Sequence, residues 1–344
     1  MFKETLTYDD VLLVPQFSDI ESRREVDIGN WLDQDRNIKF KLPIIASPMD
    51  TICEEKMAIA MARMGGLGIV HRYNTIEKQT QMAETIFENV AAEKVGFAIG
   101  VSGDYLERAT ELFKIGGKIF CIDVAHGDHI LMQRAIEQLR KKLGNAPHIM
   151  AGNVATLDGF NHLAAWGANS IRVGIGGGSI CSTRIQTGHG VPSLESIIDC
   201  ANTNYNVAII ADGGIKNSGD IAKALAARAD FAMIGSILSG TDCTPGDITL
   251  SENGDRRKAY RGMASKDAQM DWRGKTSSLE GISTTVPYKG ATFDIVEQLE
   301  NGIRSAFSYS GSRTIQEYWA KAKFVRQSGA SMSESRTHIL ERNH

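Results

Sequence analysis

The chain has 344 residues, of which 42% are hydrophobic and 23% charged, a composition typical of a folded globular protein. A net charge of −3 argues against a nucleic-acid partner and against an acidic membrane surface. The N-terminus carries acidic residues, and no uncharged apolar run reaches about 18 residues, so we expect a cytoplasmic protein without a secretory signal or membrane span.

Short apolar or β-branched runs recur along the chain and predict β-strands, most of them closing on Gly, Asp, Ser or Asn. In chain order they cover residues 43–47, 68–71, 96–100, 119–123, 148–153, 171–174, 208–212 and 231–235. Between them, apolar residues at three- and four-residue spacing predict helices, most clearly over 54–64, 105–114, 129–143 and 219–228. This alternation predicts an α/β fold, a closed (β/α)₈ barrel. A doubly wound open sheet is the alternative, but nothing marks a reversal of strand order.

The pattern changes near Gly240. Residues 241–290 are polar, rich in glycine and poor in periodicity, which is typical of an active-site flap or of a disordered segment. A helix is expected over 293–305, and a basic tail follows Tyr318, with Lys321, Lys323 and Arg326 expected on a solvated helix face. We therefore expect residues 1–344 to form one barrel domain with a flap at about 241–290 and a C-terminal tail at about 306–344.

Glycine-rich segments follow the last three predicted strands. Residues 174–178 hold four glycines in five positions, and Ser179 comes next. Asp212-Gly213-Gly214 and Gly235-Ser236 follow the seventh and eighth strands. Catalytic groups of (β/α)₈ barrels lie at the C-terminal ends of the strands, and the last loops commonly bind phosphate through backbone amides. The sequence thus predicts a phosphate site here, with the Ser179 hydroxyl as a further donor.

Five cysteines are scattered along the chain without a CxxC pair, so neither a disulfide framework nor a zinc site is indicated. Cys181 alone lies in a glycine-rich loop at a strand end, close to Arg184. Backbone amides and positive charge stabilise a thiolate, so Cys181 is a candidate nucleophile. Thr183 and Glu280 are polar groups that could move protons, although their spacing does not show it.

The sequence resembles the IMP dehydrogenase / GMP reductase family over nearly its whole length. The segments that carry the resemblance are residues 8–15 (YDDVLLVP), 47–51 (SPMDT), 174–184 (GIGGGSICSTR), 212–214 (DGG), 260–263 (YRGM) and 286–290 (VPYKG). In that family the loop cysteine attacks C2 of a purine nucleotide, and the resulting thioimidate exchanges hydride with a nicotinamide cofactor. The resemblance therefore implies that Cys181 is the nucleophile, assisted by Thr183 and Glu280.

The resemblance also implies the binding residues. Those for the nucleotide would be Ser179, Asp212, Gly213, Gly214, Gly235, Ser236, Gly262, Met263, Ala264 and Gly281. Those for the cofactor would be Ser22, Arg23, Arg72, Asp123, Val124, Ala125, Ile175 and Gly176. A monovalent cation, K⁺, would lie near Gly176, Gly178, Cys181 and Arg184, and the assembly would be a homotetramer. The implied partners are GMP and IMP.

Two branches of the family remain open. The dehydrogenase oxidises IMP to XMP with NAD and activates water with an Arg-Tyr pair on a long flap, whereas the reductase converts GMP to IMP and ammonia with NADPH. No Arg-Tyr dipeptide occurs in residues 262–281, Ser22-Arg23 is similar to an NADPH-binding motif of the reductases, and no regulatory CBS domain separates the second and third strands. Because water activation needs its base, we expect the reductase.

Other features favour the dehydrogenase or fit neither branch. Residues 47–50 and 260–263 read like dehydrogenases, Gly177 replaces a proline that both branches usually have, and Ser182 replaces a threonine. A third reading is a nucleotide-binding protein impaired in turnover. The retention of Cys181, Thr183 and Glu280 together argues against that reading.

Overall fold

The computed structural model of the chain describes residues 3–33, 37–277 and 279–335. Eight parallel strands close into a barrel, as the sequence predicts, with each observed strand within one residue of its expected bounds. They are β4 (Ile44–Ala46), β5 (Leu67–Val70), β6 (Val95–Ile99), β7 (Ile119–Asp123), β8 (His148–Val154), β9 (Ser170–Val173), β10 (Ala208–Asp212) and β11 (Phe231–Ile234). β11 pairs with β4 and so closes the cylinder, which excludes the open sheet.

The barrel interior is a packed apolar core. Ile45, Ile69, Cys121, Met150 and Ile210 point inward from their strands and are fully buried. A short hairpin of β2 (Asn30–Trp31) and β3 (Lys39–Phe40) covers the N-terminal end, where the Phe40 ring meets the Phe231 ring edge-on at 6.0 Å. The barrel interior is therefore filled at this end, and the catalytic groups of such barrels lie at the opposite, C-terminal end.

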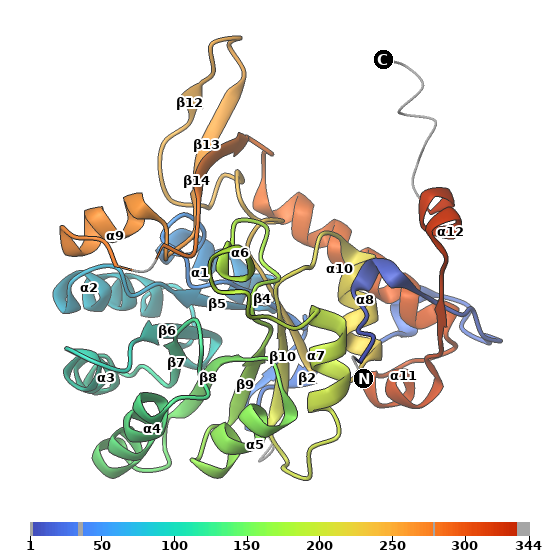
Figure 1. Ribbon diagram of the computed structural model, residues 1–344, viewed down its shortest axis with the longest axis horizontal. Helices are drawn as coiled ribbons and strands as arrows, with labels where there is room; N and C mark the ends of the chain where they lie inside the picture. The colour runs from blue at the N-terminus through green and yellow to red at the C-terminus, as the bar shows by residue number, and fades with distance from the viewer. Residues whose placement is uncertain (1–2, 34–36, 278, 336–344) are drawn as a thin grey trace.

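Helices surround the barrel (Figure 1). They are α1 (Glu55–Arg63), α2 (Ile76–Phe87), α3 (Tyr105–Lys114), α4 (Ile130–Leu143), α5 (Leu157–Ala165), α7 (Ser193–Cys200) and α8 (Ser218–Ala226). The short helix α6 (Thr183–Thr187) belongs instead to the loop at the C-terminal end of β9. In α3 the buried side chains Tyr105, Ala109 and Leu112 recur at helical spacing, which is why the sequence predicts this helix with its observed bounds. Thr75, Thr156 and Asn217 cap the first turns of α2, α5 and α8.

The flap is more ordered than the sequence suggests. Residues 241–290 hold a three-stranded antiparallel sheet, β12 (Thr249–Leu250), β13 (Arg256–Arg261) and β14 (Ser283–Pro287), which projects above the barrel, and the helix α9 (Lys266–Arg273) (Figure 1). The poor periodicity of this stretch therefore does not mean that it lacks helices and strands. In β13 the buried positions are occupied by Lys258 and Tyr260. The strand therefore lacks the alternation of apolar and polar residues by which a half-buried strand is recognised in a sequence. The Lys258 ammonium donates to the carbonyls of Thr241 and Thr244, which satisfies its charge.

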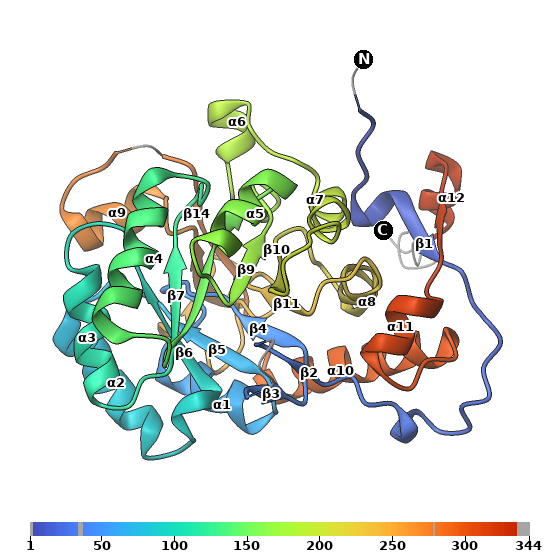
Figure 2. The same cartoon turned by 90° about the horizontal axis from the view of Figure 1, so that it is seen from below.

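The segment before the barrel and the segment after the flap meet on one side of the barrel (Figure 2). After α10 (Thr292–Tyr309) and α11 (Ile315–Lys321), β15 (Phe324–Arg326) pairs antiparallel with β1 (Val11–Leu13), and α12 (Gly329–Glu334) follows. The helix over 293–305 is confirmed. The expected helical face for Lys321, Lys323 and Arg326 is wrong, because Arg326 belongs to a strand and pairs with Glu4. Residues 336–344 of the expected tail lie outside the described residues.

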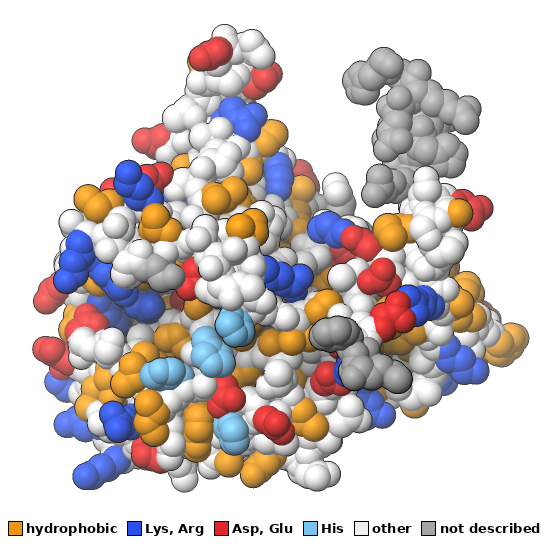
Figure 3. All heavy atoms as spheres, viewed as in Figure 1, with side chains coloured by type: hydrophobic (Ala, Val, Ile, Leu, Met, Phe, Trp, Pro, Cys, Tyr) orange, Lys and Arg blue, Asp and Glu red, His pale blue; other side chains and the backbone are white. Residues whose placement is uncertain are grey.

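Three 3₁₀ turns complete the described elements: η1 (Tyr8–Asp10), η2 (Arg23–Glu25) and η3 (Ala92–Lys94). Among the described residues, no helix is both long and apolar enough to cross a membrane. The face drawn in Figure 3 carries acidic and basic side chains interspersed over most elements. This distribution agrees with the small net charge.

Candidate active site

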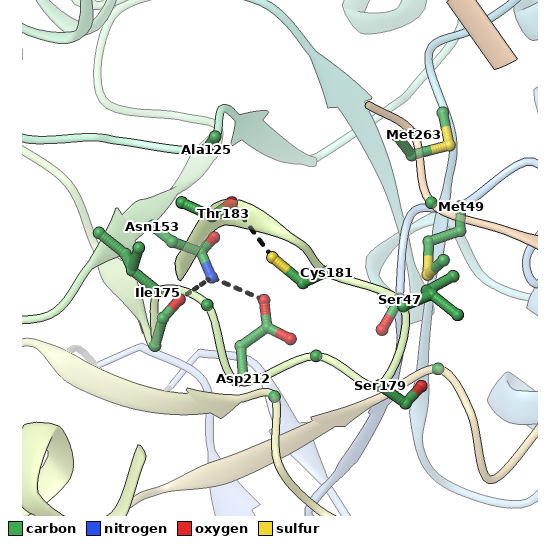
Figure 4. Close-up of a pocket in the computed structure, with 18 of the residues that line it drawn as sticks. Ser47, Met49, Ala125, Asn153, Ile175, Ser179, Cys181, Thr183, Asp212 and Met263 are labelled. Carbon is green, nitrogen blue, oxygen red and sulfur yellow. Dashed lines mark hydrogen bonds between the residues drawn. The ribbon is translucent and has the colours of Figure 1, made fainter. Parts of the chain in front are cut away.

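A cavity of about 720 Å³ opens at the C-terminal end of the barrel. Its walls come from the loops after the barrel strands, from the flap and from the N-terminal turn η1. Figure 4 shows Cys181, Thr183 and Asp212 facing one another across it, with Ser179 and Met263 farther along the wall. The glycine-rich loops expected to bind a ligand therefore do surround one space.

The loop after β9 owes its shape to its glycines. Gly174 has φ +142°, and a Cβ there would lie 1.9 Å from the carbonyl oxygen of Asp212, so only glycine lets these two strand ends approach. At Gly177, where the family usually has proline, a Cβ would lie 2.4 Å from the Ser193 hydroxyl oxygen. The Ser193 side chain thus occupies the space that a larger residue 177 would need, which gives this departure a structural reason.

Three side chains form a hydrogen-bonded chain beside the cavity. The Cys181 thiol donates to the Thr183 hydroxyl, with Sγ and Oγ1 3.2 Å apart, and the Thr183 hydroxyl donates to Glu280 Oε2 at 2.7 Å. Thr183 is buried, whereas Cys181 and Glu280 are half-buried and line the cavity. A proton can therefore pass between the sulfur and the carboxylate through one hydroxyl.

The backbone explains how Glu280, 97 residues away in sequence from Thr183, reaches this position. Cys181 and Gly281 form an antiparallel bridge. The Ser182 amide donates to the Glu280 carbonyl at 2.9 Å, and the Ile282 amide donates to the Ile180 carbonyl at 3.1 Å. The flap is thus hydrogen-bonded directly to the cysteine loop, and this pairing sets the Glu280 side chain opposite Thr183.

A buried cluster of charges forms the floor of the cavity. Arg172 donates through Nη1 to Asp123 Oδ1 at 2.5 Å and through Nη2 to Asp212 Oδ2 at 2.8 Å, and Asn153 Nδ2 donates to the same Asp212 oxygen at 2.8 Å. Burial alone would lower the pKa of Arg172, but the nearby Cys121, Asp212 and Asp123 raise it well above its ordinary value. Arg172 therefore stays charged and fixes both carboxylates.

Sequence reasoning missed Arg172 and Asn153 as site residues. Both lie within predicted strands that are otherwise apolar, and both are buried. A signal was present, because an arginine inside a buried barrel strand needs partners for its charge. The identity of those partners depends on which strands are neighbours at the same level of the barrel.

One end of the cavity is lined by hydrogen-bond donors suited to phosphate. The Ser179 and Tyr260 hydroxyls lie 3.2 Å apart, and the backbones of Gly213, Gly214 and Gly235 lie nearby. Ser236 lines the same end. Tyr260, which sequence reasoning did not assign to the site, reaches it from β13 of the flap.

The other end lies beneath α9. The Trp272 ring stacks on the Tyr73 ring, with centroids 6.0 Å apart and planes at 19°, and the Arg72 guanidinium lies over Tyr73 at 5.4 Å. Arg72, Tyr73 and Arg273 all line the cavity. Two arginines thus lie at the end opposite the phosphate donors, which suits a second ligand that carries negative charge.

The flap is further attached by ion pairs. Arg261 at the end of β13 binds Asp50 after β4 at 2.6 Å and Asp271 in α9 at 2.5 Å. The Asp50 amide also donates to Met263 Sδ at 3.3 Å. These contacts join β13, α9 and the first barrel strand around the cavity mouth.

Nearly all of the residues expected from the sequence line this cavity. They are Cys181, Thr183, Glu280, Ser179, Asp212, Gly213, Gly214, Gly235, Ser236, Gly262, Met263, Ala264, Arg72, Asp123, Val124, Ala125, Ile175, Gly176, Gly178 and Arg184. Gly281 lies beside it through its bridge to Cys181. Ser22 and Arg23 do not line it; the Ser22 hydroxyl instead accepts from the Arg24 amide and caps η2. Their cofactor role stays a prediction.

The other cysteines differ from Cys181 in their surroundings. Burial raises the pKa of Cys121 and of Cys200 to about 12, so both thiols stay protonated at neutral pH. Cys53 is also fully buried with a raised pKa, and burial raises the pKa of Cys243 as well. Cys181 alone among the described cysteines lines the cavity.

The carbonyls expected to bind a monovalent cation are compatible with one. The Gly178 carbonyl accepts from the Cys181 amide at 3.1 Å, and the Arg184 carbonyl accepts from the Gly188 amide at 3.0 Å. Each carbonyl retains a second lone pair. No cluster of three or more His, Cys, Asp or Glu suited to a metal occurs among the residues the structure describes.

Comparison with known proteins agrees with this geometry. The model of the IMP dehydrogenase / GMP reductase domain matches residues 5–338. The inosine-5'-monophosphate dehydrogenase of Cryptosporidium parvum is 36% identical over 98% of this chain and 95% of its own, and the GMP reductase of Leishmania major is 32% identical over 98% of each. A crystal structure of a GMP reductase variant from Trypanosoma brucei, in complex with guanosine 5'-monophosphate, superimposes with a TM-score of 0.91 at 30% identity over 98% of each chain.

Proposed function

This chain belongs to the IMP dehydrogenase / GMP reductase family, and from that premise we propose that it is a GMP reductase that converts GMP to IMP and ammonia with NADPH. The family membership establishes an oxidoreductase of purine nucleotide metabolism. The observation that carries the proposal is the chain from the Cys181 thiol through Thr183 to Glu280. It supplies a nucleophile and a proton path at one point of the cavity.

The reaction needs these groups in order. The Cys181 thiolate attacks C2 of the guanine, and a C–S bond forms. The C2–N bond then breaks, and the departing amine takes a proton from the Thr183–Glu280 pair and leaves as ammonia. When bound, the cofactor supplies a hydride to C2. The C–S bond breaks and the thiolate is restored, so GMP, NADPH and two protons give IMP, NADP⁺ and ammonium.

The remaining residues would hold the ligands. The Ser179 and Tyr260 hydroxyls and the amides of Gly214, Gly235 and Ser236 suit the 5'-phosphate, and Asp212, fixed by Arg172, suits the ribose hydroxyls. Asp123, Val124 and Ala125 would lie against the nicotinamide. A K⁺ ion would bind the loop carbonyls, and we propose a homotetramer, as the resemblance implies.

IMP dehydrogenase is the second candidate, and one observation favours it. Although the chain has no Arg-Tyr dipeptide in residues 262–281, the fold brings Tyr73 together with Arg72 and Arg273 at the cavity. Burial raises the pKa of Tyr73, while the two arginines oppose this shift. A tyrosine beside two arginines has the functional groups needed to activate water. Tyr73 nevertheless lies in the loop after β5 and not in the flap.

The near-ultraviolet absorbance of reduced nicotinamide tests the proposal directly. Loss of NADPH absorbance with GMP, and not with IMP or XMP, is the expected result. A gain of absorbance with IMP and NAD would instead establish the dehydrogenase. If neither pair reacts while GMP and IMP still bind by calorimetry, the protein is a binding module and the proposal is wrong.

The covalent step has its own test. Cys181→Ala should abolish turnover, because Cys181 is the only cysteine among the described residues that lines the cavity, while nucleotide binding stays within about tenfold of the wild type. Cys243→Ala serves as the matched control and should retain activity, since Cys243 does not line the cavity. A Cys181 variant that keeps one-tenth of the wild-type rate or more would exclude covalent catalysis by this residue.

A further inference from the structure

Ser193 is a polar residue in the wall of the main cavity to which neither the sequence nor the proposed mechanism gives a role. It is the first residue of α7, it lines the cavity, and only 6% of its surface is exposed. Its hydroxyl makes no hydrogen bond within the described part of the chain. A hydroxyl withdrawn from bulk water in this way lowers stability unless a ligand or an ordered water provides its partner.

The Ser196 hydroxyl, one turn further along α7, provides a contrast. It also has no partner, but Ser196 is completely buried and does not line the cavity. The Ser193 oxygen is not among the polar atoms of the described residues that are both unpaired and sealed from solvent. Because most of Ser193 is buried and the residue borders the cavity, a ligand bound there can reach the hydroxyl.

The glycine at position 177 makes room for the Ser193 hydroxyl. A Cβ on residue 177 would lie 2.4 Å from the Ser193 oxygen and 3.5 Å from the Gly214 amide nitrogen. The hydroxyl and the Gly214 amide are therefore both close to this one point, in the loop that also carries Ser179. The Gly214 amide and the Ser179 hydroxyl are among the groups that suit the 5'-phosphate. Ser193 thus lies at the phosphate end of the cavity.

The charges near Ser193 suit an anion. The helix α7 begins at this residue without a side-chain cap, so the positive end of its dipole lies at the cavity wall. Asp9 also lines the cavity, but Lys216 neutralises it through contacts of 2.7 and 2.6 Å. Glu195, in the first turn of α7, pairs with Lys3 at 2.7 Å. Each of these two carboxylates therefore has a lysine of its own, and neither opposes a bound phosphate.

We propose that the Ser193 hydroxyl is a further ligand of the nucleotide 5'-phosphate and donates a hydrogen bond to one of its oxygens. It acts beside the Gly214 amide and adds to the donors supplied by Ser179 and Tyr260. Gly177 then belongs to the phosphate site as well, because its missing side chain leaves the space that the hydroxyl occupies. This inference rests on the purine mononucleotide of the proposed function, and it applies to the reductase and to the dehydrogenase alike.

Calorimetry of Ser193→Ala with GMP, and with guanosine, which lacks the phosphate, tests the proposal. Loss of a hydrogen bond to a charged group should raise the Kd for GMP about tenfold or more, while the Kd for guanosine stays within about twofold. Without ligand the variant should unfold at or above the temperature of the wild type, because the hydroxyl has no internal partner to lose. Ser196→Ala is the matched control on the same helix and should change neither dissociation constant.

Gly177→Ala tests the same contact from the loop. The backbone of Gly177 is outside the left-handed region, and among the described residues the new methyl group would meet only the Ser193 oxygen at less than 3.4 Å. The hydroxyl must then turn away, so the affinity for GMP should fall as it does in Ser193→Ala. In the double variant the affinity should fall by no more than about a further twofold, because both changes remove the same hydrogen bond.

Three results would overturn the proposal. The first is an unchanged affinity of Ser193→Ala for GMP, and the second is an equal loss for GMP and guanosine, which would place the hydroxyl away from the phosphate. The third is a double variant in which the two losses multiply. A wild type that binds neither GMP nor IMP would overturn this inference and the proposed function together. Binding of GMP with the expected losses but without turnover would contradict the proposed function alone.

Discussion

Thr183 joins the two chemical groups of the candidate active site. Its hydroxyl accepts from the Cys181 thiol and donates to Glu280, so it is bonded on both sides. A hydroxyl held in this way can accept a proton from one partner and pass its own proton to the other, while its oxygen stays in place. In the proposed mechanism, the Glu280 carboxylate is then the group that takes up and releases the proton.

Glu280→Gln should slow GMP reduction by at least about a hundredfold, because general acid–base groups contribute roughly 10² to 10⁴ in rate. Glutamine keeps the size and one acceptor of glutamate but cannot take up the proton. Steady-state kcat measures the effect, and the KM for GMP should change little. Glu252→Gln, at the exposed tip of the flap hairpin, is the matched control and should retain wild-type activity. A rate within threefold of the wild type would remove Glu280 from the proton path.

At the scale of elements, the flap depends on a few contacts with the barrel. Its strands β12 and β14 are almost entirely exposed, so it gains little from burial of apolar surface. Its position rests on the bridge between Cys181 and Gly281, the ion pairs of Arg261 and the stacking of Trp272 on Tyr73. An element held in this way opens more easily than the barrel helices do.

Trp272→Leu tests the stacking contact. Aromatic pairs are worth about 0.5–1.5 kcal/mol beyond their burial, so the apparent KM for NADPH should rise roughly two- to tenfold as α9 and Arg273 leave the cavity mouth. Cleavage within residues 262–281 by a protease should become faster by a similar factor. Trp166→Leu removes a comparable stack, with His162 at 5.8 Å and 17°, far from the flap, and should change neither quantity. If both variants behave alike, the stacking does not position the flap.

At the scale of the whole molecule, the N-terminal end of the barrel carries buried ionisable groups that affect stability. Burial lowers the pKa of His148 to about 3, and its Nε2 lies 2.8 Å from the Ser170 hydroxyl. The imidazole is neutral in the folded chain but protonates in the unfolded chain below about pH 6.5. The contribution of His148 to the free energy of unfolding is therefore constant above pH 6.5 and falls as the pH is lowered from 6.5 towards 3.

Urea unfolding between pH 7 and 4 measures this contribution. Relative to His148→Gln, which can keep the contact with Ser170, the wild type should lose roughly 1.4 kcal/mol per pH unit below pH 6. Asp230, whose pKa burial raises to about 7, acts in the opposite direction, but it is present in both proteins and cancels from the difference. Parallel curves for the two proteins would show that His148 is not buried in its neutral form.

The cofactor role expected for Ser22 and Arg23 depends on assembly. Within one chain these residues belong to η2, and Glu25 of this turn pairs with Arg313 at 3.4 Å, away from the cavity. A second copy of the chain that places its η2 at the cavity of the first would bring them to a cofactor. The proposed homotetramer would supply such a neighbour.

Arg23→Ala should then weaken the binding of NADPH by about 2 kcal/mol, since charge-assisted hydrogen bonds contribute roughly 1.5–3 kcal/mol. The binding of NADH, which has no 2'-phosphate, should stay nearly unchanged. The apparent constants of both cofactors measure the difference. Arg24→Ala, one residue along the same exposed turn, is the control and should affect neither cofactor. An equal loss of affinity for NADPH and NADH, or no loss for NADPH, would mean that Arg23 does not bind the 2'-phosphate.

The sequence by itself determined the barrel and the cysteine loop. Buried parallel strands need continuous apolar runs, and backbone that approaches a ligand closely needs glycine. Both features can therefore be recognised from short segments of the sequence. Residues 119–123 and 208–212 were therefore predicted with the bounds of β7 and β10. The candidate residues of the strand-end loops met in one cavity because parallel strands end on the same side.

Only the tertiary structure decided the rest. β13 buries Lys258 and Tyr260, whose partners come from other segments, so its sequence carries no apolar alternation. Arg172 serves the site only because β7 and β10 place Asp123 and Asp212 on either side of it. The contact of Glu280 with Thr183 spans 97 residues and depends on the pairing of the flap with the cysteine loop. The local sequence indicates that a buried polar residue requires a partner. Which residue is that partner is determined by the packing of segments that are distant in sequence.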